Sequence, residues 1–357
     1  MNFPASLKKN ARFLVFLLKI GIMLLIFYWV LKDSGSFASH LLHADPRWLI
    51  PAVLCLALQT LLSFLRWGML LQGLGVKLSF RELTSLGMLG MFFSLVIPGG
   101  AVGGDLIKAG ILAGRSPEGK KFHGVFSIIT DRIIGMMALF SFTLLFSLLF
   151  LERIRALRSD LRYLVFFLMI LSAGGLCAGA GMWMHEILFR PRFMRRLLEW
   201  GDAIGKNVFS NTIEALQLYR ENWALPLRAF ALSFFLMVPL LILALFFSVK
   251  ATEGATRLST SPPSSSAAAS EGAGAGFSDC VLASTLSNTA SAIPLTPGGL
   301  GTRDYVSKGM LLSGGASEPN ATAATLLFSA ISILISLSGA FFFLPGTGLR
   351  KTCRKRT

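Results

Sequence analysis

Long apolar runs separated by short polar stretches dominate this chain. About 20 consecutive apolar residues are enough to cross the hydrocarbon core of a bilayer as a helix. Such runs predict full transmembrane helices over residues 13–31, 48–70, 124–150, 163–184, 224–249 and 321–344. The pattern therefore predicts an all-α polytopic membrane protein, with a single integral membrane domain over residues 1–345 and a basic cytoplasmic tail over 346–357.

Two further apolar stretches are short or interrupted. Residues 83–97 stop at Pro98, and residues 278–296, which are rich in small and hydroxylated side chains, stop at Pro297. The first would span only about 22 Å as a helix, less than the roughly 30 Å of a hydrocarbon core. Proline and glycine both break helices, and broken backbone at membrane depth is tolerated only where it is buried or lines a cavity. We therefore predict two re-entrant or broken segments.

The two breaks share a sequence pattern. The first copy runs Pro98, Gly99, Gly100, Ala101, Val102, Gly103, Gly104, Asp105, and the second runs Pro297, Gly298, Gly299, Leu300, Gly301, Thr302, Arg303, Asp304. A lysine follows each copy, at Lys108 and Lys308. Paired interruptions in two halves of a chain are typical of a transporter binding site. The alternative is a pair of ordinary Pro-Gly loops at the membrane surface, since such loops are rich in both residues.

The order of the elements predicts inverted repeats. A unit of span, broken segment and span occurs at 48–150 and again at 224–344. Lys and Arg concentrate in cytoplasmic loops, which places both termini in the cytoplasm. The first broken segment then enters from the cytoplasmic side and the second from the outside, as in many secondary transporters.

Three polar stretches connect the spans. Residues 151–162 carry four arginines on the predicted outer side, so either this loop binds anionic lipid headgroups or the topology is wrong. Residues 185–222 interleave basic and apolar positions, which indicates amphipathic cytoplasmic helices, or else a solvated linker. Residues 251–277 are rich in Ser, Ala, Gly and Pro and predict a flexible outer loop.

Ionisable residues also occur inside the predicted spans. Asp131 and Arg132 lie about two turns into the span at 124–150. Charges within a membrane are costly and indicate function, unless the pair lies at the inner headgroup boundary. Arg66 lies near the inner end of the span at 48–70, and we expect it to snorkel to the interface.

Composition narrows the possible functions. The chain has 357 residues, 54% of them hydrophobic and only 15% charged, against about 25% in soluble domains. Cytoplasmic Lys and Arg account for the net charge of +16 better than nucleic-acid binding does. The four cysteines form no C-x-x-C pair, and the close histidines His40 and His43 lie in a polar loop without a nearby cysteine. We expect no metal, no cofactor, and, without a Walker A motif, no ATP hydrolysis.

Three segments together resemble a known family. Ile97 to Gly100 with Gly103 to Asp105, then Thr130-Asp131-Arg132, then Pro294 to Asp304, are similar to motifs of the flippase-like membrane domain of bacterial lysylphosphatidylglycerol synthases and its stand-alone relatives. The resemblance covers roughly residues 10–345. The family commonly has glutamate where this chain has Asp304, and the soluble aminoacyl-transferase domain of the synthases is missing here. The resemblance implies lipid handling in the bacterial inner membrane, and does not imply lipid lysinylation.

The leading hypothesis is a translocator of phospholipids or polyprenyl-linked lipids. Helix N-termini after the glycine-rich breaks would offer N–H groups to a phosphate, and buried cations would add charge. The predicted substrate-binding residues are Pro98, Gly99, Gly100, Gly103, Gly104, Asp105, Lys108, Asp131, Arg132, Pro297, Gly298, Gly299, Gly301, Arg303, Asp304 and Lys308. Asp105, Asp131 and Asp304 would pair with the cations or carry a coupling proton. The alternatives are a transferase that uses a polyprenyl-phosphate sugar, with Asp105 or Asp304 as base or metal ligand, and a non-catalytic partner of an envelope-lipid enzyme.

Overall fold

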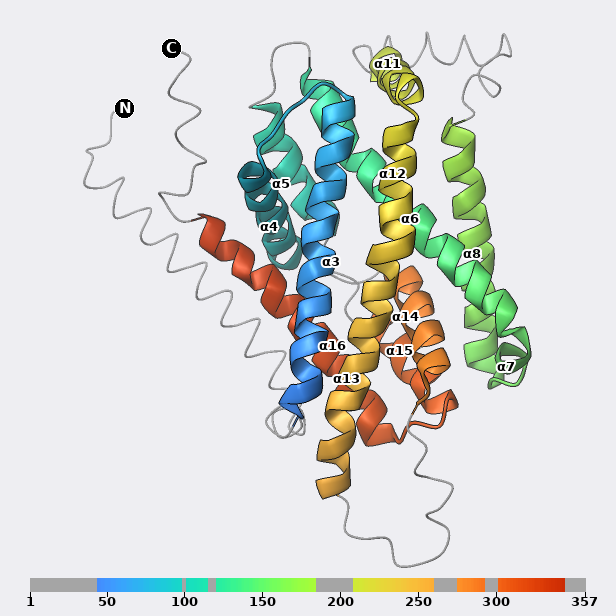
Figure 1. The fold of residues 1–357 in the computed structure, drawn as a ribbon. Coiled ribbons are helices and arrows are strands. Elements are labelled where there is room, and N and C mark those ends of the chain that lie inside the picture. The colour runs from blue at the N-terminus through green and yellow to red at the C-terminus, as the bar shows by residue number, and fades with distance from the viewer. Residues whose placement is uncertain are drawn as a thin grey trace, which may run out of the picture.

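The computed structural model describes residues 44–97, 101–114, 120–183, 208–259, 275–292 and 301–343, and every regular element within these ranges is a helix (Figure 1). Five helical stretches among them are long and apolar enough to cross a membrane. They are α3 (Pro46–Gly73), α6 (Lys121–Leu149), α8 (Ser159–Trp183), the continuous run of α12 (Ala224–Leu232), η1 (Ser233–Met237) and α13 (Val238–Ser259), and α16 (Glu318–Ser338), which continues into η4 (Gly339–Phe343). The prediction of an all-α polytopic protein is confirmed, and the predicted span at 13–31 lies outside the described residues.

Each broken segment consists of two short helices that pack against each other. The first pair is α4 (Phe80–Val96) with α5 (Ala101–Ala113), and the second is α14 (Phe277–Ser291) with α15 (Thr302–Ser313). The pairs lie in opposite halves of the bundle, α4 and α5 in the upper half of Figure 1 and α14 and α15 in the lower half. A capping box starts α4, because Ser79 and Glu82 satisfy each other's backbone N–H groups. Pro98, Gly99, Gly100, Pro297, Gly298 and Gly299 lie outside the described residues.

The upper end of the bundle carries α11 (Val208–Glu221) and the lower end carries α7 (Leu151–Arg155) (Figure 1). We call these the α11 end and the α7 end. Ala215, Leu216 and Tyr219 on one side of α11 are buried against the spans, and the Tyr219 hydroxyl donates to the carbonyl of Leu70 at 3.1 Å. Burial raises the pKa of this hydroxyl above its ordinary value. The described part of residues 185–222 is therefore an amphipathic helix.

Hydrogen bonds between buried side chains connect α14 with α6 and α16 with α13. The hydroxyls of Thr143 on α6 and Thr289 on α14 are 2.7 Å apart, so these helices share a buried hydrogen bond. On α13, Thr252 donates to Asn320 of α16 at 2.5 Å. This contact lies beyond the predicted end of the span at residue 249, and α13 continues to Ser259. The predicted loop at 251–277 therefore begins with helix, which the tertiary hydrogen bond stabilises; residues 260–274 lie outside the described residues.

Candidate functional site

Five ionisable side chains from three helices meet in the half of the bundle nearer the α11 end. They are Arg66 on α3, Asp105 and Lys108 on α5, and Asp131 and Arg132 on α6, and we call them the α6 charge cluster. Asp105 accepts a hydrogen bond from Arg132 Nε and lies 3.8 Å from Lys108 Nζ. The cluster holds three cations and two carboxylates, so it carries an excess positive charge that suits an anion.

Arg66 is the most completely paired member of the cluster. Its Nε and Nη2 donate to the two carboxylate oxygens of Asp131 at 2.7 and 2.9 Å, the bidentate geometry in which arginine binds a carboxylate best. Its Nη1 donates to Ser233 Oγ at 2.8 Å. Only 8% of the Arg66 side chain and 14% of the Asp131 side chain are exposed. The expectation that Arg66 snorkels is therefore wrong: α3 continues for about two turns beyond it, and Asp131 offers a buried counter-ion.

Local backbone features make room for this ion pair. A Cβ at Gly135 would lie 2.8 Å from Arg66 Nη1, so a larger residue there would collide with the guanidinium. Ser233 lies at the start of η1, a five-residue π-helical segment that ends two residues before Pro239. Proline lacks an N–H and clashes with the preceding turn, which accounts for the irregular segment at this point. The π segment thus places the Ser233 hydroxyl against the charge cluster.

Lys108 is held between an aromatic ring and a glycine. Its Nζ lies 4.4 Å from the ring centre of Trp67, within the range of a cation–π interaction. Its aliphatic stem passes over Gly90 of α4, where a Cβ would overlap it. A Cβ at Gly104 would overlap the Gly90 carbonyl oxygen and Ser94 Oγ. Glycine at these positions lets α4 and α5 approach closely enough to bring Lys108 into the cluster.

A second buried charge lies at the start of α15, in the half of the bundle nearer the α7 end. Arg303 Nη2 donates to Ser329 Oγ at 2.7 Å, and Ser329 donates to Asp304 Oδ1 at 2.5 Å. The guanidinium also lies 4.8 Å from the ring centre of Phe328. Asp304 caps its own helix by accepting from the N–H of Gly301, whose φ of +87° is a conformation that glycine adopts readily. We call Arg303, Asp304 and Ser329 the α15 cluster.

One donor of Arg303 remains available. Its Nε is buried, has no hydrogen-bond partner among the described residues, and lies 3.8 Å from Asp304 Oδ1, too far for a hydrogen bond. A small cavity of about 10 Å³ adjoins it, with room for roughly one water molecule. Hydroxyl and amide side chains from α14, α15 and α16 line this cavity, among them Ser287, Asn288, Ser307 and Thr325. The α15 cluster therefore lies in a polar environment within an apolar bundle.

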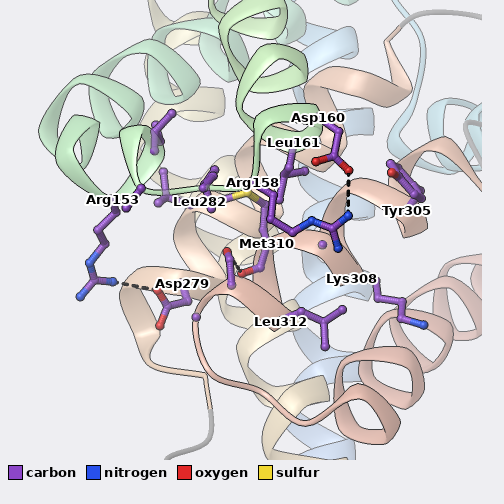
Figure 2. A pocket seen from close by; sticks show the side chains of 16 residues that line it. Arg153, Arg158, Asp160, Leu161, Asp279, Leu282, Tyr305, Lys308, Met310 and Leu312 are labelled. Atoms are coloured by element: carbon purple, nitrogen blue, oxygen red, sulfur yellow. Dashed lines mark hydrogen bonds and ion pairs between the residues drawn. The ribbon is translucent and has the colours of Figure 1, made fainter.

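A much larger cavity of about 840 Å³ opens at the α7 end (Figure 2). The segment that joins α6 to α8 forms one wall with Arg153 and Arg158, and α15 forms the other with Tyr305 and Lys308. Figure 2 shows Arg153 pointing to Asp279 of α14 and Arg158 pointing to Asp160, at 2.8 and 3.5 Å. We call this cavity the α7 pocket.

The structure brings some predicted site residues together and separates others. Asp105, Lys108, Asp131 and Arg132 share the α6 charge cluster, with Gly104 beside them. Gly103 is buried on the same helix. Gly301, Arg303 and Asp304 form the start of α15, whereas Lys308 pairs with Glu318 of α16 at 2.9 Å. Lys108 and Lys308 therefore have different environments, although they occupy matching positions of the motif.

Sequence reasoning missed Arg66, Ser233 and Ser329 as site residues. Ser233 and Ser329 lie within apolar runs, where a serine by itself does not indicate a site. The arginines that donate to them lie 167 and 26 residues away in the chain. Arg66 did carry a signal, since an arginine within a span needs a counter-ion and Asp131 was the nearest buried candidate in another span. The Pro239 helix breaker was the signal for the irregular segment that presents Ser233.

Comparison with known proteins identifies the family. The model of the lysylphosphatidylglycerol synthase transmembrane region matches residues 16–259, about two thirds of the chain. The chain belongs to this family. The match includes the whole α6 charge cluster and ends before α14 and α15, so the α15 cluster and the α7 pocket lie partly or wholly outside it.

A curated relative gives weaker support. The UPF0104 membrane protein PH1989 of Pyrococcus horikoshii is 22% identical over 134 residues, which is 38% of this chain and 39% of the relative. The aligned part of this chain thus spans about two fifths of the length of that relative. No solved structure matches the chain. Membership in this family of membrane regions supports a role connected with membrane lipids.

Proposed function

We propose that this protein moves phosphate-bearing lipids between the leaflets of the bacterial inner membrane. The observation that carries this proposal is the α6 charge cluster, in which five ionisable groups from the spans α3 and α6 and from the short helix α5 lie together. Ionisable groups are costly to bury in a membrane. Where they do occur, they commonly mark substrate or ion pathways. The family match, which includes this cluster, connects the task with membrane lipids.

The cluster suits a phosphate because part of it can exchange partners. Arg66 and Asp131 hold each other in a buried bidentate pair and provide a fixed frame. Arg132 is the most exposed member, with 42% of its side chain accessible, and Asp105 is its counter-ion. A phosphate that approaches Arg132 and Lys108 would compete with Asp105 for both cations. The carboxylate of Asp105 would then reclaim the cations when the headgroup leaves.

The two broken segments supply the second part of the argument. Their described helices lie in opposite halves of the bundle, and α5 and α15 carry charged groups of the matching motifs, Asp105 with Lys108 and Arg303 with Asp304. Interrupted helices that face each other in two halves are the arrangement in which transporters bind a ligand near the midplane and expose it alternately to either side. In this proposal the α6 charge cluster serves the α11 side and the α15 cluster serves the α7 side.

A lipid-flip assay tests the function. The purified full chain would be reconstituted in vesicles that contain phosphatidylglycerol with a nitrobenzoxadiazole-labelled acyl chain, with and without an imposed proton gradient. Dithionite destroys the label only in the outer leaflet, so translocation appears as fluorescence loss beyond that leaflet's share. We expect the wild-type protein to give this additional loss. Rates equal to those of protein-free vesicles under all gradients would overturn the proposal.

Asp105→Asn is the variant that tests the cluster. It keeps the shape of the side chain but removes the charge that resets Arg132 and Lys108, so we expect it to insert normally and to lose translocation. Glu152→Gln is the matched control, because Glu152 is an exposed carboxylate whose partner Arg155 is also on the surface. Wild-type rates in Asp105→Asn would remove the cluster from the mechanism.

A further inference from the structure

The α7 pocket lies at the boundary between membrane and water. Its α7 wall joins the end of α6 to the start of α8, and both helices are long and apolar enough to span a bilayer. The connection between two such spans lies at the depth of the lipid headgroups. The cavity and the headgroup of a bilayer lipid are therefore expected at the same depth.

The lining of the pocket is amphipathic. Leu157, Leu161 and Leu312 line the pocket with partly exposed apolar side chains, and we call them the apolar floor. Arg153, Arg158 and Lys308 form a basic rim, with the phenol of Tyr305 beside them (Figure 2). A volume of about 840 Å³ lies within the range of small-molecule sites. A ligand that matches this surface has a negatively charged polar head joined to an apolar body.

The rim cations are not equally free to meet a ligand. Arg153 donates to Asp279 and Ser278 at 2.8 and 2.9 Å, and Asp279 caps α14 through the N–H of Gly276, so this pair has a structural task. Arg158 is 88% exposed and reaches Asp160 only at 3.5 Å. Lys308 pairs with Glu318, whose side chain is 73% exposed. Exposed pairs of this kind contribute little to stability, so an anion can displace either carboxylate.

We propose that the α7 pocket binds the phosphate of a glycerophospholipid, with Arg158 and Lys308 as the phosphate ligands and the apolar floor as the surface for the acyl chains. This site rests on the proposed function and would be where the headgroup is held on the α7 side of the membrane. Arginine provides a planar fork for phosphate oxygens and lysine a single strong charge. The apolar floor and the headgroup depth favour a lipid over a free phosphate.

The position of Lys308 connects the pocket with the buried α15 cluster. Tyr305, Lys308 and Leu312 line the pocket from one side of α15, at helical spacings of three and four residues. Arg303 and Asp304 are in the first turn of the same helix. A Cβ at Gly309 would lie 3.3 Å from Leu161 of α8, so α15 packs tightly against the opposite wall at this point. A phosphate held by Lys308 is thus in contact with the helix that carries the second charge cluster.

Binding of a short-chain lipid to the purified protein tests this site. The full chain in detergent would be titrated with dioctanoyl-phosphatidylglycerol by calorimetry, with dioctanoylglycerol and inorganic phosphate as separate ligands. We expect saturable binding of the phospholipid. Dioctanoylglycerol, which lacks the phosphate, and inorganic phosphate, which lacks the chains, should each bind at least tenfold more weakly, since each loses one part of the match.

The Arg158→Gln/Lys308→Gln double variant should bind dioctanoyl-phosphatidylglycerol at least tenfold more weakly, and Arg158→Lys/Lys308→Arg should restore most of the affinity. Arg155→Gln is the matched control, because it lies in the same segment, is exposed and does not line the pocket. Unchanged affinity in the double variant, or an equal loss in Arg155→Gln, would overturn the assignment. Inorganic phosphate that competes at the affinity of the lipid would show a site for soluble phosphate instead.

This titration is independent of transport. Loss of binding in the double variant together with no lipid flip by the wild-type protein would retain the site and reject the proposed function. Lipid flip at wild-type rates with binding insensitive to Arg158 and Lys308 would do the reverse. Size-exclusion profiles and melting temperatures of the variants would show that each one is folded, so a loss of affinity would report the pocket itself.

Discussion

At the residue scale, Arg66 and Asp131 depend on each other because neither charge has water to replace its partner. We expect Arg66→Met and Asp131→Leu each to destabilise the protein by about 3–5 kcal/mol, since each leaves one buried charge uncompensated. The double variant should recover most of this loss, because it buries apolar side chains in place of both charges. Thermal unfolding in detergent, read as a double-mutant cycle, measures the coupling. Additive single losses would show that the pair does not act as a unit.

Arg303 offers a prediction about geometry at the same scale. Its guanidinium donates to Ser329 and stacks on Phe328, two contacts that depend on a flat group. Arg303→Lys keeps the charge but loses the planar fork, so we expect lipid translocation to fall at least tenfold while membrane insertion is retained. Arg155→Lys, an exchange of one exposed cation for another, should leave the rate unchanged. Equal rates in the two variants would show that only the charge at residue 303 matters.

Single residues were also where sequence reasoning was least complete. The motif placed charges at Asp105, Lys108, Arg303 and Asp304, and the cost of buried charge drew attention to Asp131 and Arg132. Which charges pair with each other could not be predicted. Asp131 accepts hydrogen bonds from Arg66, which lies 65 residues away in the chain, although Arg132 is its neighbour in sequence. Partners on different spans are set by helix packing, and one sequence carries no direct signal of which helices become neighbours.

At the element scale, we expect alanine substitutions at two glycines of α5 to change the stability of the protein in opposite directions. Gly104→Ala should destabilise the protein by about 1–3 kcal/mol, because the added Cβ overlaps the Gly90 carbonyl and forces α4 and α5 apart. Gly110→Ala should stabilise it by about 0.5–1 kcal/mol, because that position faces open space and alanine is the better helix former. Chemical denaturation of both variants in the same detergent checks the signs. Two changes of the same sign would contradict the close packing of this helix pair.

Apolar length alone was enough to find most elements. Five predicted spans correspond to helices, and separate short helices lie on either side of each predicted break, α4 and α5 at the first and α14 and α15 at the second. The ends were less predictable. The low-complexity composition suggested a loop from residue 251, whereas hydrogen bonding between Thr252 and Asn320 keeps α13 helical to Ser259. A tertiary contact can override a local preference, and the contact is not visible in the residues that it orders.

At the scale of the whole molecule, basic residues lie at both ends of the bundle, so the rule that places positive charge in the cytoplasm does not by itself decide the orientation. Lys77, Arg81, Lys120 and Lys121 lie at the α11 end and favour a cytoplasmic location for it. Four arginines between residues 153 and 162 lie at the α7 end and oppose that orientation. Ion pairs with Glu152, Asp160 and Asp279 offset the charge of three of these arginines. A lipid phosphate bound in the α7 pocket would account for the basic character of this segment on the outer side.

Cysteine labelling decides between the two orientations. In a background without the four native cysteines, Arg155→Cys and Glu214→Cys place single thiols on exposed positions at the two ends, one on α7 and one on α11. We expect a membrane-impermeant maleimide to label residue 155 in intact spheroplasts and residue 214 only after permeabilisation. The reverse pattern would be compatible with the same fold but would place the α7 pocket on the cytoplasmic side. The positive-inside rule alone would then account for its arginines, without a bound lipid. Labelling of both thiols from one side would contradict a membrane crossing by α8, which separates α7 from α11, and the two broken segments would then not enter the membrane from opposite sides.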